Sequence, residues 1–199
     1  MNLPNKLTVM RIILVPIFVI ALLSAGLPGR YLIAELIFAA ASLTDHYDGK
    51  IARERNQITN FGKFLDPLAD KILVISALVC FLELGFANVW CVLLIIAREF
   101  MVTSIRLVAM DSGQVIPANR WGKFKTVSQI IAVIIVLALQ YVGSLISAGT
   151  VAPFTVAGMT SGEAFLLFGN IILWIATFFT VLSGIVYIRQ NIRLINTTK

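Results

Sequence analysis

The sequence predicts an all-α integral membrane protein with six transmembrane helices and both termini in the cytoplasm. Of its 199 residues, 59% are hydrophobic and 13% are charged, with a mean hydropathy of +0.93. Soluble domains are usually ~45–50% apolar and ~25% charged, so the composition excludes a soluble globular protein, and it excludes a disordered chain as well. A spanning helix needs ~20 mostly apolar residues. The chain therefore has room for about six spans, in a single domain covering residues 1–199.

Apolar runs give the order of the expected helices, with turn residues between them. The runs lie at about residues 8–26, 31–50, 64–86, 88–110, 124–147 and 165–190. The breaks contain Gly26 to Gly29, Gly85 to Asn88, Asp111 to Gly113, and a stretch rich in Gly, Thr and Pro from Ser147 to Gly162. We expect the last of these breaks to form a long loop, residues 148–163, on the outer side of the membrane.

Basic residues set the expected orientation. The chain has 16 Lys and Arg against 10 Asp and Glu, a formal net charge of +6. Twelve of the basic residues fall on one set of loops and helix ends, whereas the opposite loops contain only Arg30. This asymmetry places the basic loops and both termini in the cytoplasm, next to anionic lipid headgroups. No nucleic-acid-binding module is recognisable, so we expect membrane lipids and no nucleic acid as partners.

Four carboxylates lie around the break between the second and third expected helices. Asp45 and Asp48 are three residues apart, and Asp66 and Asp70 are four apart, so each pair shares one helix face. Two helices joined by a short turn can direct all four side chains to one point. Converging carboxylates near hydrocarbon repel one another unless a cation neutralises them. All-oxygen ligands suit a hard divalent metal such as Mg²⁺ or Mn²⁺.

The neighbours of these aspartates favour a phosphate-bearing substrate over four merely solvated carboxylates at helix ends. Gly49 and Gly62 leave room for a close approach to the backbone. Arg53, about one turn beyond Asp48, can neutralise phosphate oxygens. A metal beside a basic residue at the cytoplasmic face is typical of enzymes that act on phosphorylated substrates.

The spacing of these residues resembles the motif of the CDP-alcohol phosphatidyltransferase family. The motif is D-x-x-D-G-x-x-A-R, eight residues, then G-x-x-x-D-x-x-x-D, and residues 45–70 match every fixed position. Further segments resemble bacterial members that make phosphatidylglycerophosphate, namely residues 2–8, 61–71, 98–100 and 122–126. The last two expected spans match only in being apolar. The resemblance implies a six-helix fold, a homodimer, and a polar active-site cavity open to the cytoplasm and the lipid, in a multi-pass protein of the bacterial cell membrane.

The resemblance also implies a reaction and residue roles. CDP-diacylglycerol and sn-glycerol 3-phosphate would give phosphatidylglycerophosphate and CMP. Asp45, Asp48, Asp66 and Asp70 would hold Mg²⁺ or Mn²⁺, and Asp70 would be the general base for the acceptor hydroxyl. Nucleotide and diphosphate binding is assigned to residues of the matching segments: Asn5, Thr8, Gly49, Arg53 and Gly62.

Charged residues of the fourth expected helix and of the cytoplasmic loop that follows it are candidates for binding the acceptor's phosphate. Charges inside an apolar run are functional candidates by default, and a basic rim suits a dianionic acceptor. The candidates are Arg98, Arg106, Arg120, Lys123 and Lys125. Two structural alternatives remain open: Glu99 and Arg106 can pair inside the bundle, and the loop residues can simply face anionic headgroups.

Other functions remain open at this point. The same chemistry can use another acceptor, such as inositol phosphate, serine or phosphatidylglycerol. An intramembrane prenyltransferase would need different Asp spacings and more spans. A divalent-cation transporter would bind its ion near the midplane, whereas these carboxylates lie at the cytoplasmic mouth. Cys80 and Cys91 have no partner motif, and we expect both to be buried, inert thiols.

Overall fold

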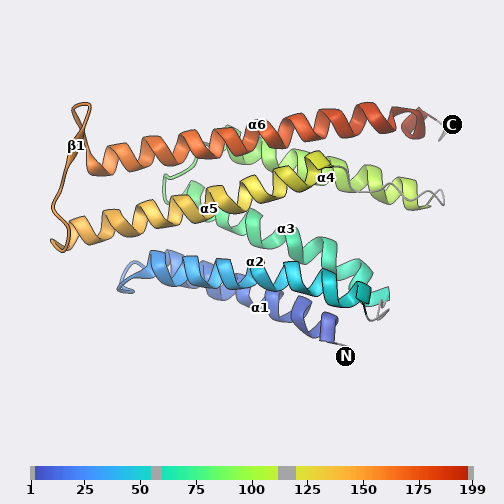
Figure 1. Cartoon of the computed structure of the whole chain (residues 1–199), viewed down its shortest axis with the longest axis horizontal. Coiled ribbons are helices and arrows are strands. Elements are labelled where there is room, and N and C mark those ends of the chain that lie inside the picture. Colours follow the sequence, from blue (N-terminus) through green and yellow to red (C-terminus); the bar gives the residue numbers. More distant parts are fainter. Residues whose placement is uncertain (1–2, 55–59, 112–119, 197–199) are drawn as a thin grey trace.

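The described residues of the protein form six helices and one short hairpin (Figure 1). The computed structural model describes the backbone of residues 3–54, 60–111 and 120–196, and the side chains of residues 9–44, 71–110 and 120–191. The elements follow one another as α1 (Leu3–Leu23), α2 (Arg30–Glu54), α3 (Asn60–Glu83), α4 (Val89–Asp111), α5 (Arg120–Ser147), β1 (Thr155–Val156), β2 (Met159–Thr160) and α6 (Ser161–Asn196).

The six expected helices are confirmed, but several of their ends lie elsewhere. Helix α1 begins at Leu3, α3 at Asn60 and α6 at Ser161, each several residues before the apolar run. Hydropathy detects only the apolar part of a helix, whereas backbone hydrogen bonding continues through the polar residues that flank it. The helices therefore extend beyond the apolar runs from which they were predicted.

Glycines in the left-handed conformation end α3 and α5. After α3, Gly85 has φ +73°, its N–H bonds to the carbonyl of Leu82, and the N–H of Phe86 bonds to the carbonyl of Phe81 at 2.7 Å. After α5, Gly149 has φ +75° and the same bond pattern follows. This double bond is the Schellman motif, in which glycine avoids the steric penalty of a positive φ.

A β-hairpin occupies part of the stretch expected to be a plain loop. Thr155 pairs with Thr160, and Val156 pairs with Met159, in an antiparallel register. The two residues between the strands both have positive φ, 51° at Ala157 and 81° at Gly158. Two consecutive positive φ values give the tight turn that matches strand twist, so β-forming residues around Ala-Gly were the overlooked signal.

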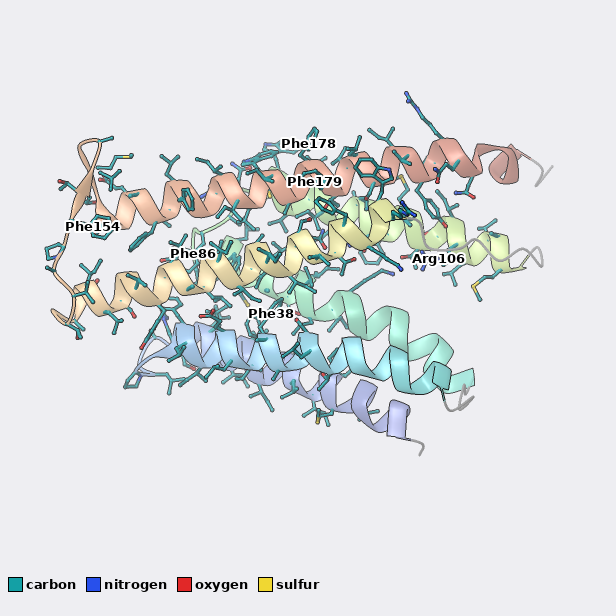
Figure 2. The ribbon with its side chains drawn as sticks, in the orientation of Figure 1. Phe38, Phe86, Arg106, Phe154, Phe178 and Phe179 are labelled. Atoms are coloured by element: carbon teal, nitrogen blue, oxygen red, sulfur yellow. The ribbon has the colours of Figure 1, made fainter. Side chains whose placement is uncertain are left out.

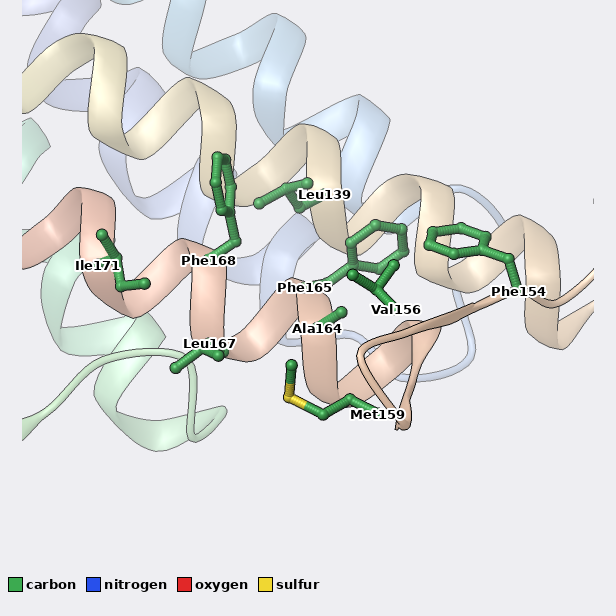
Figure 3. A pocket seen from close by; sticks show the side chains of 9 residues that line it. All are labelled: Leu139, Phe154, Val156, Met159, Ala164, Phe165, Leu167, Phe168 and Ile171. Atoms are coloured by element: carbon green, nitrogen blue, oxygen red, sulfur yellow. The ribbon is translucent and has the colours of Figure 1, made fainter.

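A reciprocal cap joins the hairpin to α6. The N–H of Thr160 donates to Glu163 Oε2 at 2.8 Å, and the N–H of Glu163 donates to Thr160 Oγ1 at 3.4 Å. This capping box satisfies two backbone groups at the helix start. Beneath the hairpin, α5 and α6 enclose an apolar pocket of about 320 Å³, in which Phe154 and Phe165 lie close together (Figure 3).

The helices pack as two groups of three. Helix α1 packs against α2 and α3, and α6 packs against α4 and α5. The groups meet mainly where α2 contacts α5 (Figure 1). One apolar core runs through both groups, with side chains from all six helices, among them Phe18, Phe38, Phe81, Ile95 and Leu137.

The two ends of the bundle differ in the chain segments that they contain. Both termini lie at one end, which we call the terminal end, and the hairpin lies at the other, the hairpin end (Figure 1). Arg106 lies toward the terminal end and Phe154 at the hairpin end (Figure 2). Helix α2 finishes, and α3 starts, at the terminal end (Figure 1).

The surface of the bundle is apolar. Large hydrophobic side chains are exposed on every helix, including Ile20, Leu36, Val79, Trp90, Ile131 and Phe178. Within the described part of the chain, two helical stretches are long and apolar enough to cross a membrane, Arg120–Ser147 and Ser161–Asn191. Exposed apolar surface of this extent is typical of a protein that faces lipid.

Candidate active site

The predicted metal and nucleotide residues lie on α1, α2 and α3. Helix α2 contains Asp45 and Asp48, and α3 contains Asp66 and Asp70, in the parts of these helices nearest the terminal end (Figure 1). Their side chains lie outside the described residues. The same holds for the predicted nucleotide-binding residues, Asn5 and Thr8 on α1, Gly49 and Arg53 on α2, and Gly62 on α3.

A buried ion-pair cluster joins α4 to α5. Glu99 Oε1 accepts a hydrogen bond from Arg98 NH1 at 3.2 Å and forms an ion pair with Lys125 Nζ. The exposed fractions are only 8% for Arg98, 7% for Glu99 and 6% for Lys125. Two of the predicted acceptor residues are thus brought together around the carboxylate of Glu99. This link between them was not predicted from the sequence.

Lys71 connects this cluster to the aspartate-bearing helix. Its Nζ donates a hydrogen bond to Thr103 Oγ1, and Thr103 Oγ1 donates to the backbone carbonyl of Glu99 at 2.7 Å. Lys71 follows Asp70 directly in the sequence, so this contact places the α3 backbone at Asp70 near the cluster. Lys71 was not among the predicted site residues, although a lysine within an apolar run beside an aspartate is a usable signal.

Among the described side chains, the ion-paired group of Arg98, Glu99 and Lys125 carries more positive than negative charge. Lys71 and Arg98 both lie close enough to Lys125 to repel it, and Glu99 is the carboxylate that attracts Lys125. Glu99 is thus shared by two buried cations, Arg98 and Lys125. Buried charges require partners, and an excess of cations in a buried place favours an anionic ligand. Phosphate is one of the anions that Arg and Lys commonly bind.

Neutral polar contacts continue from the cluster along α5 and α6. Gln129, one turn after Lys125, donates its Nε2 to Thr180 Oγ1 at 3.0 Å, and Thr180 Oγ1 donates to the carbonyl of Ala176 at 2.7 Å. Both Gln129 and Thr180 are buried. These contacts fix α6 against α5 beside the charged cluster, so three helices surround Arg98 and Lys125.

The remaining predicted acceptor residues are exposed. Arg106 on α4 lies near enough to Arg98 for electrostatic repulsion. Arg120 and Lys123 lie on the first turn of α5. Arg120 borders an open groove of about 510 Å³ with Trp121, Phe124 and Phe179. Among the described residues, the ion-pair partners of Glu99 are Arg98 and Lys125, so the pairing of Glu99 with Arg106 considered above is not observed.

The described side chains contain no group of three His, Cys, Asp or Glu that could hold a metal. The four aspartates offer the only carboxylate pairs that the sequence places one helical turn apart on two neighbouring helices. Four carboxylates are a donor set that fits a hard divalent cation, Mg²⁺ or Mn²⁺.

Both cysteines are buried and free, as expected. Cys91 Sγ is hydrogen-bonded to Thr177 Oγ1, and Thr177 Oγ1 donates to the carbonyl of Leu173 at 2.8 Å. Cys80 belongs to the apolar core. Neither thiol contacts the charged cluster, which is consistent with structural roles.

Comparisons with known proteins show the family of the chain. The profile of the CDP-alcohol phosphatidyltransferase family matches residues 1–186. A CDP-diacylglycerol–glycerol-3-phosphate 3-phosphatidyltransferase of Bacillus subtilis is 41% identical over 208 aligned residues, covering 99% of this chain and 98% of its own. Proteins of the same name from Rickettsia felis, with 94% of each chain covered, and from Pseudomonas fluorescens, with 87% and 86% covered, are both 37% identical. The chain belongs to the CDP-alcohol phosphatidyltransferase family.

Proposed function

We propose that this protein transfers the phosphatidyl group of CDP-diacylglycerol to sn-glycerol 3-phosphate, giving phosphatidylglycerophosphate and CMP. Relatives that cover almost the whole chain have names that state this reaction. The observation that carries the choice of acceptor is the buried pair of cations, Arg98 and Lys125, around the single carboxylate of Glu99. A dianionic acceptor fits this excess of positive charge, whereas serine would not need it.

Asp45, Asp48, Asp66 and Asp70 would hold Mg²⁺ or Mn²⁺. The metal, when bound, supplies positive charge that neutralises the diphosphate and the CMP leaving group. Asn5, Thr8, Gly49, Arg53 and Gly62 would hold the nucleotide and the diphosphate from α1, α2 and α3. This assignment rests on the match of the chain to the family motif.

In the transfer itself, Asp70 would accept the proton of the acceptor hydroxyl. The acceptor oxygen then forms a bond to the phosphorus that bears the lipid, and the bond from that phosphorus to CMP breaks. Arg98 and Lys125 would bind the acceptor's phosphate and orient its hydroxyl toward the lipid-bearing phosphorus. Arg106, Arg120 and Lys123, which are exposed, would attract the anionic acceptor to the site.

The proposed setting is a bacterial cell membrane, with residues 1–199 as one six-span domain, both termini in the cytoplasm and the active site facing it. Three features support this arrangement: the apolar surface on all six helices, the position of both termini at one end, and the scarcity of basic residues at the hairpin end. Three connections lie at the hairpin end, those between α1 and α2, α3 and α4, and α5 and α6. Among their described side chains and the residues that flank them, Arg30 is the one basic residue. A homodimer is proposed from the resemblance to the family.

The test is CMP release by the purified protein in detergent, from CDP-diacylglycerol and Mg²⁺, with each acceptor supplied separately. We expect release with sn-glycerol 3-phosphate, loss of release with EDTA, and recovery with Mg²⁺ or Mn²⁺. Release only with serine, inositol phosphate or phosphatidylglycerol would refute the acceptor and keep the aspartate chemistry. Metal flux into proteoliposomes without any CMP release would favour a transporter instead.

A further inference from the structure

Two buried hydrogen-bond donors near the cluster have no partner in the described part of the chain. They are Nε of Arg98 and the hydroxyl of Tyr187. The exposed fractions of these two residues are 8% and 3%. Arg98 NH1 is held by Glu99 Oε1, so one edge of the guanidinium is engaged and the Nε atom is left over. Buried donors without partners are costly, and they are typical of places that receive a ligand or water.

Helix α6 has a glycine, Gly184, at the point where the side chain of Arg98 packs against it. A Cβ atom at Gly184 would lie 2.9 Å from Arg98 Cγ, 3.8 Å from Arg98 Nε and 3.6 Å from Met101 Cε. The first distance is too short for a real contact, so the side chain of Arg98 takes its present course only because residue 184 is glycine. Arg98 is thus held from two sides, by Glu99 on its own helix and by the backbone of α6.

Tyr187 lies on the same face of α6 as Gly184, because residues three apart in a helix are neighbours on its surface. It also lies near enough to the Arg98 guanidinium to interact with it electrostatically. The α6 face formed by Gly184 and Tyr187 therefore places a second buried donor beside Arg98 Nε. Sequence reasoning missed both residues, since a lone glycine and a lone tyrosine in an apolar run show no pattern.

We propose that Tyr187 is a binding residue for the acceptor's phosphate, to which its hydroxyl donates a hydrogen bond alongside Arg98 Nε, and that Gly184 positions Arg98 for this contact. The proposal rests on the proposed function and extends the acceptor site to α6. A phosphate has several oxygens that each accept more than one hydrogen bond, so it can satisfy both unpartnered donors at once. Lys125 and Arg98 supply positive charge, whereas the Tyr187 hydroxyl supplies a directional hydrogen bond that orients the phosphate.

The first experiment replaces Tyr187 by Phe, which removes the hydroxyl and keeps the ring. We expect the KM for sn-glycerol 3-phosphate to rise roughly tenfold or more, as for a lost hydrogen bond to a charged group. The KM for CDP-diacylglycerol should stay within about twofold of wild type, since uniform damage would affect both substrates. The matched control is Tyr141→Phe, a half-buried tyrosine in the part of α5 nearer the hairpin end.

The second experiment replaces Gly184 by Ala, with Gly169→Ala as its control. A Cβ at Gly169 would meet only Val136 Cγ2 at 3.4 Å, so both variants add one methyl group to α6 but only one displaces Arg98. We expect Gly184→Ala to raise the KM for sn-glycerol 3-phosphate several-fold more than Gly169→Ala. Unfolding midpoints measured in parallel separate this effect from a loss of stability.

The outcomes separate this inference from the proposed function. Wild-type CMP release with sn-glycerol 3-phosphate, combined with an unchanged KM in Tyr187→Phe, would overturn the role of Tyr187 and leave the reaction intact. An equal effect of Gly184→Ala and Gly169→Ala would overturn the positioning role of Gly184. Absence of release by the wild-type protein with this acceptor would overturn both the reaction and the site built on it.

Discussion

The hairpin end and the terminal end of the bundle satisfy their polar groups in different ways. At the hairpin end, the partners are close in sequence: Thr160 and Glu163 cap α6 reciprocally, and Ser147 Oγ donates to the carbonyl of Gly143 at 3.0 Å. Toward the terminal end, the partners come from different helices, as Lys71 with Thr103 and Glu99 with Lys125. There, Arg98 Nε is left without a partner among the described residues.

This difference distinguishes a structural role from a ligand-binding role. Local capping completes the backbone hydrogen bonding at a helix end and leaves no unpaired polar group for a ligand to bind. Buried charges collected from α4 and α5 gain little stability. An incompletely satisfied set is best explained by a ligand that completes it. Substitutions of the charged residues toward the terminal end should therefore affect substrate use or the stability gained from ligand, and those at the hairpin end should affect stability alone.

The largest effect is expected from Asp70→Asn. Removing the proposed general base should lower kcat about 10³-fold, within the range for acid–base catalysis, while the protein stays folded. The matched control is Glu83→Gln, an exposed carboxylate at the other end of the same helix, which should keep full activity. CMP release and the unfolding midpoint are measured for both. Turnover of Asp70→Asn above about a tenth of wild type would remove Asp70 as the base.

Glu99→Gln should cause the next largest effect, on stability. The substitution leaves Arg98 and Lys125 buried without their shared carboxylate, and removing one partner of a buried pair costs about 3–5 kcal/mol. Saturating sn-glycerol 3-phosphate should restore part of the loss, because its phosphate replaces the missing anion. Unfolding midpoints with and without this ligand test the expectation. A midpoint equal to that of Glu83→Gln would contradict it.

Lys125→Ala should raise the KM for sn-glycerol 3-phosphate by roughly 10- to 100-fold, the range for a lost hydrogen bond to a charged group. The KM for CDP-diacylglycerol should change less than about twofold. Gln129→Ala, one turn further along α5, removes a buried neutral group that bonds to Thr180, so it should lower stability and leave both KM values unchanged. Parallel increases in both KM values of Lys125→Ala would place Lys125 outside the acceptor site.

The smallest effect is expected at the hairpin end, from Thr160→Ala. Loss of the helix cap costs about 1 kcal/mol, which corresponds to a fall of roughly 2–4 °C in Tm for a chain of this size. The KM and kcat values should not change. Thr150→Ala, an exposed threonine in the same connection between α5 and α6, is the control for a neutral substitution. Reduced CMP release by folded Thr160→Ala would contradict the division between the two ends.

The helices could be predicted from the sequence because each apolar run is long and is separated from the next by turn residues. Their ends could not be predicted, since α1 and α6 continue through polar residues that hydropathy leaves out. The hairpin at Thr155 to Thr160 was missed because each strand has two residues, too few for a periodic pattern. The Ala157-Gly158 turn was the feature of the sequence that could have indicated the hairpin.

The candidate site was predictable only where its residues form a local pattern. The aspartates stand at fixed spacings within one segment, so their pattern is visible before folding. Arg98 and Lys125 could be proposed from their charge, but their connection through Glu99 depends on how α4 packs against α5. Gly184 and Tyr187 become visible only when α6 is placed beside Arg98. Contacts between distant segments arise from tertiary packing, which no short-range pattern encodes.

The two groups of three helices divide the proposed chemistry between them. Helices α2 and α3 of the first group contain the aspartates, whereas α4, α5 and α6 of the second group contain Arg98, Lys125 and Tyr187. On this proposed assignment, substitutions in the second group would exchange one acceptor for another without disturbing the aspartates of the first. Such a division allows new headgroup chemistry to evolve, or to be engineered, as a graft onto an unchanged catalytic half.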